Sequence, residues 1–315
     1  MREKEKRLEF NIFAALVLLF IGGALLSLNV GATEGFDEQI FWLLRVPRTI
    51  CAIAVGGGLA VAGTLIQASL GNPLADPYTI GIASAAALGA VLGSLLKSHQ
   101  FLGAGVSAFI FSLAALVFLG FWLRKSFRHS TEVLLAGVIV GFFFTSLATL
   151  VMALADPAAW TSTFTWLMGA FGPLSLSEAS ATLALMCIAT VIGWLHWKPL
   201  DLLSVDELSA ESVGLNIGAF RRRVFILVAL MTAVCVSVAG VIGFVGLIVP
   251  HTLRRLGLRR HFTLIPASFL GGAALIACSD VAARVVARPS ELPVGVVMAL
   301  MGAPFFLMIA RKQER

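Results

Sequence analysis

The stretch NIFAALVLLFIGGALLSL, residues 11–28, contains no charged side chain. As an α-helix it is about as long as the hydrocarbon core of a bilayer is thick. Basic residues precede it, as in a secretory signal. However, the apolar part is long for such a signal, and no clear small-x-small cleavage site follows it. We therefore expect a membrane helix that the protein keeps.

Nine further apolar runs follow the first. They lie at 48–68, 79–96, 101–123, 133–154, 179–197, 224–242, 244–256, 263–283 and 292–310. The run at 244–256 is the shortest and falls short of a full crossing. The predicted fold class is all-α: a polytopic membrane protein with about ten transmembrane helices.

Composition agrees with a membrane protein. Of 315 residues, 59% are hydrophobic and 13% are charged, with a mean hydropathy of +0.96. An average soluble domain carries about 25% charged residues. Ten spans leave only short loops, so we expect a single transmembrane domain over residues 1–315 and no soluble catalytic domain.

The distribution of Lys and Arg predicts the orientation. In a ten-span topology, 18 of these 23 residues lie on the same side as the termini. Cytoplasmic loops carry the excess of basic residues. Both termini are therefore expected in the cytoplasm, with the protein in the plasma membrane, which is the inner membrane of a Gram-negative cell. Topology thus accounts for the net charge of +6, and no nucleic-acid partner is expected.

A short internal repeat appears when the sequence is shifted by 177 positions. AVAGTLIQASLGNP from Ala60 then aligns with SVAGVIGFVGLIVP from Ser237. The two segments fall in the second and seventh expected spans, which run in opposite directions. This is the pattern of an inverted-topology repeat, common in transporters. A general likeness among membrane helices is the alternative.

Sequence motifs for catalysis are absent. There is no GxxxxGK[ST] loop, so ATP hydrolysis, if it drives this protein, must occur in another chain. HExxH, GxSxG and CxxC motifs are also missing, which argues against a membrane-bound enzyme. The four cysteines lie in apolar runs without metal-ligand spacing, so neither a metal nor a cofactor is expected.

The longest cytoplasmic loop, 198–223, favours a docking surface over a solvated linker. Its acidic residues precede Gly214, a pattern typical of one or two short helices that end at a glycine cap. Its apolar residues need a partner to cover them: Leu202, Leu203, Leu208, Val213 and Leu215.

Arginines also lie on the opposite, outer side, where basic residues are few. Arg45 and Arg48 flank Pro47, and Arg284 follows a late span. Contact with lipid headgroups is the ordinary explanation, and an acidic partner is the other. Asp280 is the one acid deep in a late span, and an i,i+4 pair with Arg284 would neutralise it. We expect that pair.

Seven segments, in order along the chain, resemble the FecCD permeases, the membrane subunits of type II ABC importers. They are LRVPRTI from Leu44, GNPLADPYTIG from Gly71, LLAGV from Leu134, DLLSVDELSAESVGL from Asp201, AGVIGFVGLIVPHTLRRLG from Ala239, SDVAAR from Ser279 and ELPVGVVMALMGAPFF from Glu291. Together they cover the chain from about residue 44 to 310.

The resemblance implies a permease that is not itself an enzyme and binds no cofactor. Its implied partners are a second permease subunit (another copy or a paralogue), two cytoplasmic ABC ATPases that use ATP, and an extracytoplasmic substrate-binding protein. The implied cargo is a metal chelate. We expect a ferric siderophore, with cobalamin or haem as alternatives. An ion-coupled secondary transporter with Asp280 as its titratable carrier is the alternative of another class.

The resemblance also implies roles at matched positions. Arg45, Arg48 and Arg284 would pair with acids of the binding protein. Asn72 and Leu74, with Ser130 and Thr131, would form the cytoplasmic gates. The coupling segment 198–223 would contact the ATPase through Asp206, Glu207, Ser209, Ala210, Gly214 and Leu215.

Overall fold

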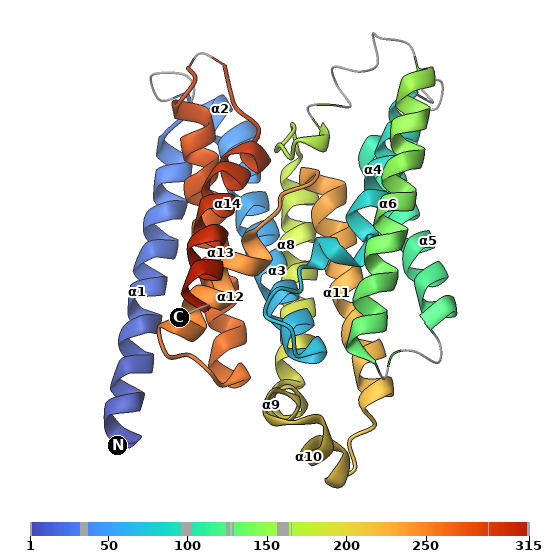
Figure 1. Ribbon diagram of the computed structural model, residues 1–315. Coiled ribbons are helices and arrows are strands. Elements are labelled where there is room, and N and C mark those ends of the chain that lie inside the picture. Colours follow the sequence, from blue (N-terminus) through green and yellow to red (C-terminus); the bar gives the residue numbers. More distant parts are fainter. Residues whose placement is uncertain are drawn as a thin grey trace. The chain divides into compact units, whose positions relative to one another are not determined.

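The computed structural model describes residues 2–31, 37–95, 103–123, 127, 129–155, 164, 166–288 and 290–313. Every regular element in these ranges is a helix, as predicted (Figure 1). The elements are α1 (Arg2–Asn29), α2 (Glu38–Ile40), the π-helical turn η1 (Phe41–Arg45), α3 (Val46–Leu70), the 3₁₀ turn η2 (Pro77–Ile80), α4 (Ile82–Leu95), α5 (Ala104–Trp122), α6 (Ser130–Leu154), α8 (Leu176–Leu195), α9 (Trp197–Val205), α10 (Glu207–Ser212), α11 (Ile217–Ala239), α12 (Val245–Arg255), α13 (His261–Val285) and α14 (Val294–Gln313).

Each of the ten apolar runs overlaps one of these helices. Among the described residues, seven helices are long and apolar enough to cross a membrane: those at Arg7–Asn29, Glu38–Leu70, Ala104–Trp122, Ser130–Leu154, Leu176–Leu195, Ile217–Ala239 and His261–Val285. α4 and α14 contribute shorter apolar stretches, Ile82–Ser94 and Val294–Phe305. α12 has only 11 residues, as its short run predicted. By length alone, α4 with 14 described residues and α12 with 11 are shorter than a full crossing needs, whereas α14 has 20 residues.

The two segments of the internal repeat differ in local structure. Gly63 lies inside the continuous helix α3. Its counterpart Gly240 ends α11 with a φ of 68°, and α12 begins only at Val245. Because one segment is unbroken and the other bends, the inverted repeat stays a prediction.

Contacts divide the chain into two compact units. Unit 1 comprises Met1–Thr64, Phe171–Lys198 and Ile242–Arg315, and unit 2 comprises Leu65–Ala170 and Pro199–Val241.

In unit 1, α1 lies beside α13, and α12 and α14 also contact α13 (Figure 1). Glycines let α3 approach its neighbours at backbone distance. A Cβ atom built on Gly56 would lie 2.3 Å from the carbonyl oxygen of Gly272 in α13. One built on Gly63 would lie 2.1 Å from that of Gly246 in α12. Small residues at such crossings are the usual way in which membrane helices pack.

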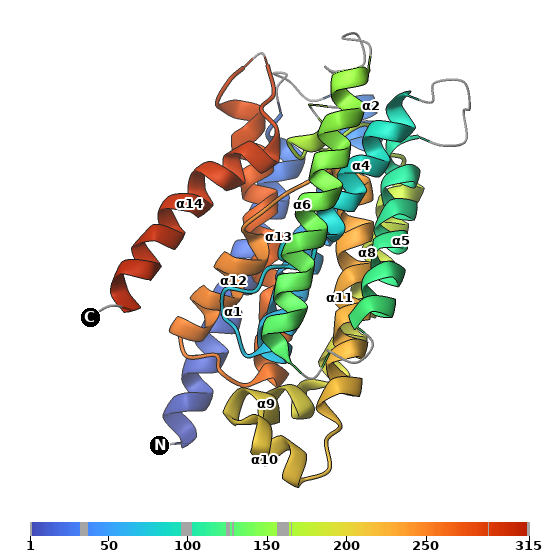
Figure 2. The ribbon, with the colours of Figure 1, turned by 45° about the vertical axis from the view of Figure 1, so that its right-hand side comes forward.

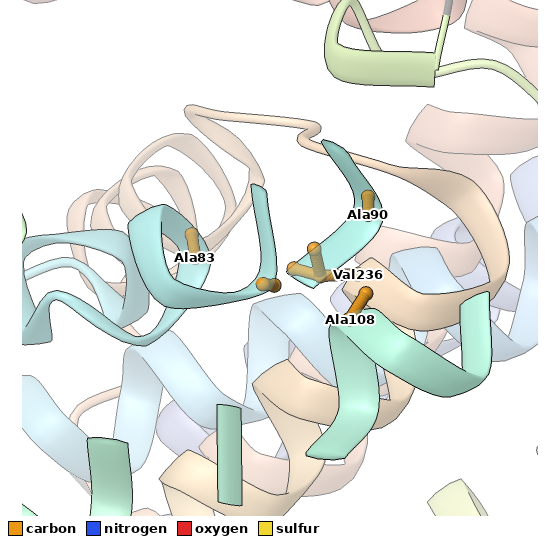
Figure 3. Packing of buried hydrophobic residues seen from close by; sticks show 5 residues of the cluster. Ala83, Ala90, Ala108 and Val236 are labelled. Carbon is orange, nitrogen blue, oxygen red and sulfur yellow. The ribbon is translucent and has the colours of Figure 1, made fainter. Parts of the chain in front are cut away.

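In unit 2, α4 packs against α5 and α6, and α11 packs against α4 and α5 (Figure 2). α4, α5 and α11 share a core cluster built mainly of alanine, which includes Ala83, Ala90, Ala108 and Val236 (Figure 3). α9 and α10 lie at the N-terminal end of α11 in both ribbon views. The coupling segment therefore joins directly to a well-packed helix.

Candidate functional site

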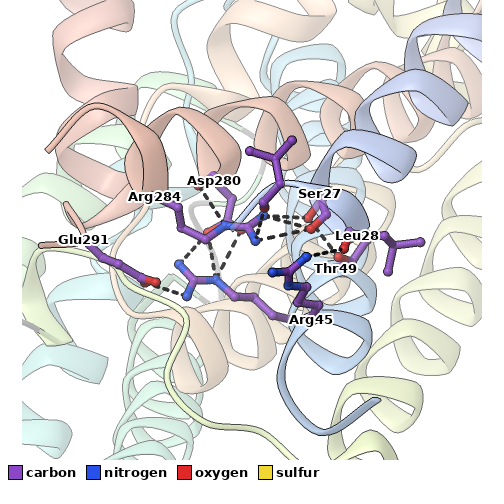
Figure 4. A network of polar contacts seen from close by, with 9 residues as sticks. Ser27, Leu28, Arg45, Thr49, Asp280, Arg284 and Glu291 are labelled. Carbon is purple, nitrogen blue, oxygen red and sulfur yellow. Dashed lines mark hydrogen bonds and ion pairs between the residues drawn. The ribbon is translucent and has the colours of Figure 1, made fainter. Parts of the chain in front are cut away.

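A cluster of charged side chains joins α3 and α13 in unit 1 (Figure 4). Its centre is Asp280, which has no exposed surface. One carboxylate oxygen lies 2.9 Å from Nη2 of Arg48, and the other lies 2.9 Å from Nη2 of Arg284. The expected i,i+4 pair with Arg284 is confirmed. The contribution of Arg48, 232 positions away, was not predicted from the sequence.

Two arginines of this region bind the C-terminal end of α1. Arg284 donates to the carbonyl oxygens of Ser27, at 3.2 Å, and Val30, at 2.8 Å. Arg45 donates to the carbonyl oxygen of Asn29 at 2.9 Å. The last carbonyls of a helix lack intrahelical partners and carry the negative end of the helix dipole, so cations are stabilised there.

Glu291 completes the cluster from the segment before α14. Its carboxylate lies 2.7 Å from Nη1 of Arg48, and its side chain is 40% exposed. The pairing with Arg48 depends on a distance between segments that the sequence does not display.

The three arginines predicted to dock a binding protein line one cavity of about 330 Å³. Arg45 is 7% exposed and Arg284 is 3% exposed, whereas the side chain of Arg48 is 18% exposed. Glu291 and the segment 171–174 line the same cavity. Their role in docking stays a prediction, and any partner carboxylate would have to reach them inside this cavity.

The predicted gate residues Asn72 and Leu74 form one turn after α3. The side-chain oxygen of Asn72 accepts a hydrogen bond from the backbone N–H of Leu74 at 2.9 Å, which fixes the turn. Leu74 is 49% exposed. Ser130 and Thr131 are the first two residues of α6. Within the described part of the chain, no hydrogen bond or ion pair joins the two pairs, so their gating role stays a prediction.

The far end of the same loop is packed tightly on α6. Gly81 has a φ of +79°, a conformation that favours glycine. A Cβ atom at this position would lie 2.8 Å from the carbonyl oxygen of Gly137 and 2.9 Å from the backbone nitrogen of Gly141. The loop 71–81 thus packs against α6 at Gly81, where there is no room for a side chain.

Asp76 is a buried acid in this loop, outside the membrane-spanning helices. It is 5% exposed, and its carboxylate accepts a hydrogen bond from the backbone N–H of Tyr78 at 2.9 Å. Burial raises the pKa of Asp76 to about 6, because an ionised carboxylate loses its hydration, and the hydrogen bond from Tyr78 offsets part of this rise.

The coupling segment folds as predicted, into two short helices with a glycine cap. Asp206 begins α10 by accepting a hydrogen bond from the backbone N–H of Ser209 at 3.0 Å. Gly214, with a φ of +88°, donates to the carbonyl oxygen of Glu211, and Leu215 donates to that of Ala210. This is a left-handed glycine cap.

Large apolar side chains of this segment remain exposed. Val205 is 82% exposed, Leu208 75% and Val213 65%, whereas Leu203 and Ala210 are buried. A row of exposed apolar residues beside an acidic helix start is typical of a protein-binding surface.

The sequence-based prediction missed Arg221 in α11. Its side chain is 2% exposed; Nε donates to the carbonyl oxygen of Ser69 at 2.7 Å, and Nη2 pairs with the carboxylate of Glu207. Helical periodicity could have indicated it. Arg221 lies four residues from both Ile217 and Phe225, which are buried on the same face of α11. The exposed Arg222 and Arg223 lie elsewhere on the helix.

Comparisons with known proteins agree on one family. The model of the FecCD transport family matches residues 10–312. The vitamin B12 import system permease protein BtuC of Salmonella typhi is 33% identical, over 99% of this chain and 98% of its own length.

The expectation of a single transmembrane domain over residues 1–315 stays a prediction.

Solved structures are similar as well. An ABC transporter described as being of the metal-chelate type, in an inward-facing conformation, has a TM-score of 0.87 and 30% identity, over 96% of this chain and 99% of its own. PsaBC from Streptococcus pneumoniae, at 19% identity, has a TM-score of 0.59 over 86% of this chain and 92% of its own. The latter likeness concerns the fold alone.

Replacing Asp280 by Asn should strongly destabilise the protein. The change leaves the guanidinium groups of Arg48 and Arg284 without their shared carboxylate, and a buried pair broken on one side costs about 3–5 kcal/mol. The control is Glu291→Gln, whose half-exposed pair with Arg48 is worth less than about 1 kcal/mol. Thermal unfolding in detergent measures both. Equal melting temperatures for the two variants would contradict the central role of Asp280.

Asp76 should make stability depend on pH. Its pKa is raised in the folded state, so its stabilising effect is complete below pH 4 and is lost as the pH rises through about 6. Asp76→Asn should melt at a higher temperature than wild type at pH 7.5, with the difference vanishing near pH 4. A difference that is constant across this range would show that the carboxyl group does not titrate as inferred.

Proposed function

The chain belongs to the FecCD transport family, and from this membership we propose that it is the permease subunit of a binding-protein-dependent ABC importer of a metal chelate. The observation that carries the proposal is the likeness, over nearly the whole chain, to an ABC transporter of the metal-chelate type. The exposed apolar surface of α9 and α10 supports it, because a permease without ATP-hydrolysing motifs needs a separate ATPase. The chain is a multi-pass protein of the cytoplasmic membrane, and we propose that both termini lie in the cytoplasm.

The proposed mechanism is alternating access driven by partner subunits. Two ATPases close on ATP and move the coupling segment 198–223. That motion reaches the gates at Asn72 and Leu74 and at Ser130 and Thr131. The chelate crosses between this chain and a second permease subunit, another copy or a paralogue, without covalent chemistry.

Three metal chelates are candidate cargos. The sequence resemblance led us to expect a ferric siderophore. The BtuC relatives are permeases of vitamin B12 import systems, so cobalamin is the second candidate. Haem is the third candidate cargo. All are large chelates that a path between two subunits could accommodate.

Uptake experiments in the host should distinguish these cargos. We expect deletion of the gene to abolish uptake of either a radio-iron siderophore complex or labelled cyanocobalamin, and the intact gene to restore it. Restoration should require the binding protein and an ATPase able to hydrolyse ATP. Uptake that persists without the ATPase and follows the proton gradient would contradict the proposal and favour the ion-coupled alternative.

For docking, we propose that a carboxylate of the binding protein enters the cavity beside Arg45. Among the described residues, Arg45 donates to carbonyl oxygens and has no carboxylate partner. Its replacement therefore leaves no buried acid unpaired. Arg48 and Arg284 line the same cavity and would strengthen the attraction.

Arg45→Gln should weaken association with the binding protein at low salt by about 1 kcal/mol, or about fivefold in Kd. The matched control is Arg288→Gln, an outer-side arginine that donates to the carbonyl oxygen of Gly31 and does not line the cavity. Affinity is measured over a salt series, with the permease in nanodiscs and the binding protein in solution. An unchanged Kd for Arg45→Gln would remove Arg45 from the docking site.

A further inference from the structure

Arg221 contacts two segments that have different roles in the proposed function: the end of α3, which precedes the gate, and α10 of the coupling segment. All three residues involved lie in unit 2: Ser69 near the end of α3, Glu207 at the start of α10, and Arg221 in α11. The loop 71–81, which carries the predicted gate residues Asn72 and Leu74 and is called the gate loop below, begins two residues after Ser69. α10 belongs to the coupling segment. One guanidinium group therefore contacts both the base of the gate and the surface expected to meet the ATPase.

On the gate side, Arg221 completes the cap of α3. The carbonyl oxygen of Gln67 accepts from the backbone N–H of Asn72 at 3.1 Å, and that of Ala68 from Gly71 at 3.4 Å. The next carbonyl, of Ser69, accepts from Nε of Arg221 at 2.7 Å. A cation at this end also opposes the negative end of the helix dipole.

On the coupling side, Glu207 is the first residue of α10 and its side chain is 50% exposed. It is thus partly at the surface and yet bound to a guanidinium group that is almost fully buried. A shift or rotation of α10 would either carry Arg221 with it or break the charge pair at a buried guanidinium group, and the second outcome is costly.

We infer that Arg221 is a positioning residue that transmits movement of α10 to the end of α3, and so to the gate loop. The inference rests on the proposed function. Arginine suits this task because its planar guanidinium donates in two directions at once, whereas a lysine ammonium is a single point of charge. The link is mechanical and involves no bond making or breaking.

Two variants test the link. Glu207→Gln removes the carboxylate that binds Arg221. Arg221→Lys keeps the positive charge but loses the planar guanidinium group that binds Ser69 and Glu207 at once. The matched control is Arg222→Gln, the neighbouring arginine, whose side chain is exposed. The complex of permease, ATPase and binding protein is reconstituted in liposomes. ATP hydrolysis and the uptake of labelled cyanocobalamin and of a ferric siderophore are measured together.

We expect the amount of cargo imported per ATP hydrolysed to fall about tenfold in Glu207→Gln and Arg221→Lys, the effect of losing one charge-assisted hydrogen bond. The ratio is compared between folded complexes, because both changes weaken a buried charge pair and should lower the melting temperature. Arg222→Gln should match wild type in every measurement. A purely structural role for Arg221 would lower the melting temperature and leave the ratio of uptake to hydrolysis unchanged.

A second readout reports on the gate directly. In Leu74→Cys, the rate of maleimide labelling at position 74 is followed by peptide mass spectrometry, which counts the native cysteines separately. Adding Glu207→Gln should change this rate in the permease alone by about threefold or more, because Arg221 loses the carboxylate that helps to hold its guanidinium group against the carbonyl oxygen of Ser69. Adding Arg222→Gln should not.

The two readouts separate the two proposals. If the wild-type complex imports nothing with ATP, the proposed function fails, and the labelling rate alone decides whether Arg221 links α10 to the gate loop. If Glu207→Gln leaves both the uptake ratio and the labelling rate at wild-type values, the link is refuted even though the importer stands.

Discussion

Asp280, without any exposed surface, lies between the guanidinium groups of Arg48 and Arg284, and much of unit 1 depends on this pairing. Water cannot solvate a carboxylate between apolar helices, so protein groups must do so. The same constraint acts at Arg221 in unit 2, which is satisfied by the carbonyl of Ser69 and the carboxylate of Glu207. In each unit a buried charge therefore ties helix ends together that are distant in sequence.

Small residues let the helices of both units pack closely. Apolar side chains gain little by leaving lipid for protein, so helices must approach closely enough for van der Waals contact to hold them. Gly56 against Gly272 brings α3 to α13 at backbone distance, and Gly81 does the same for the gate loop on α6. The alanine core of unit 2 extends the pattern over α4, α5 and α11. When helices pack this closely, a displacement of one helix also displaces its neighbour.

Features of the candidate site that depend on neighbouring residues were predictable. The glycine cap at Gly214 and the pair between Asp280 and Arg284 both follow from spacings within one helical turn. The partners Arg48 and Glu291, and the link from Arg221 to Ser69, lie up to 243 positions apart, and no local pattern indicates them. Burial of Arg221 alone among three consecutive arginines follows from the helical phase of α11, a signal that the run of like charges obscured.

The sequence by itself determined the membrane class, the positions of ten helices and the family, because hydropathy, helix caps and motifs are properties of consecutive residues. Only the tertiary structure decided which arginines are buried, that Gly240 interrupts a helix where Gly63 does not, and that the outer arginines share one cavity. These features depend on how closely separate helices approach one another. That approach is set by the sum of many packing contacts, which no single segment of the sequence records.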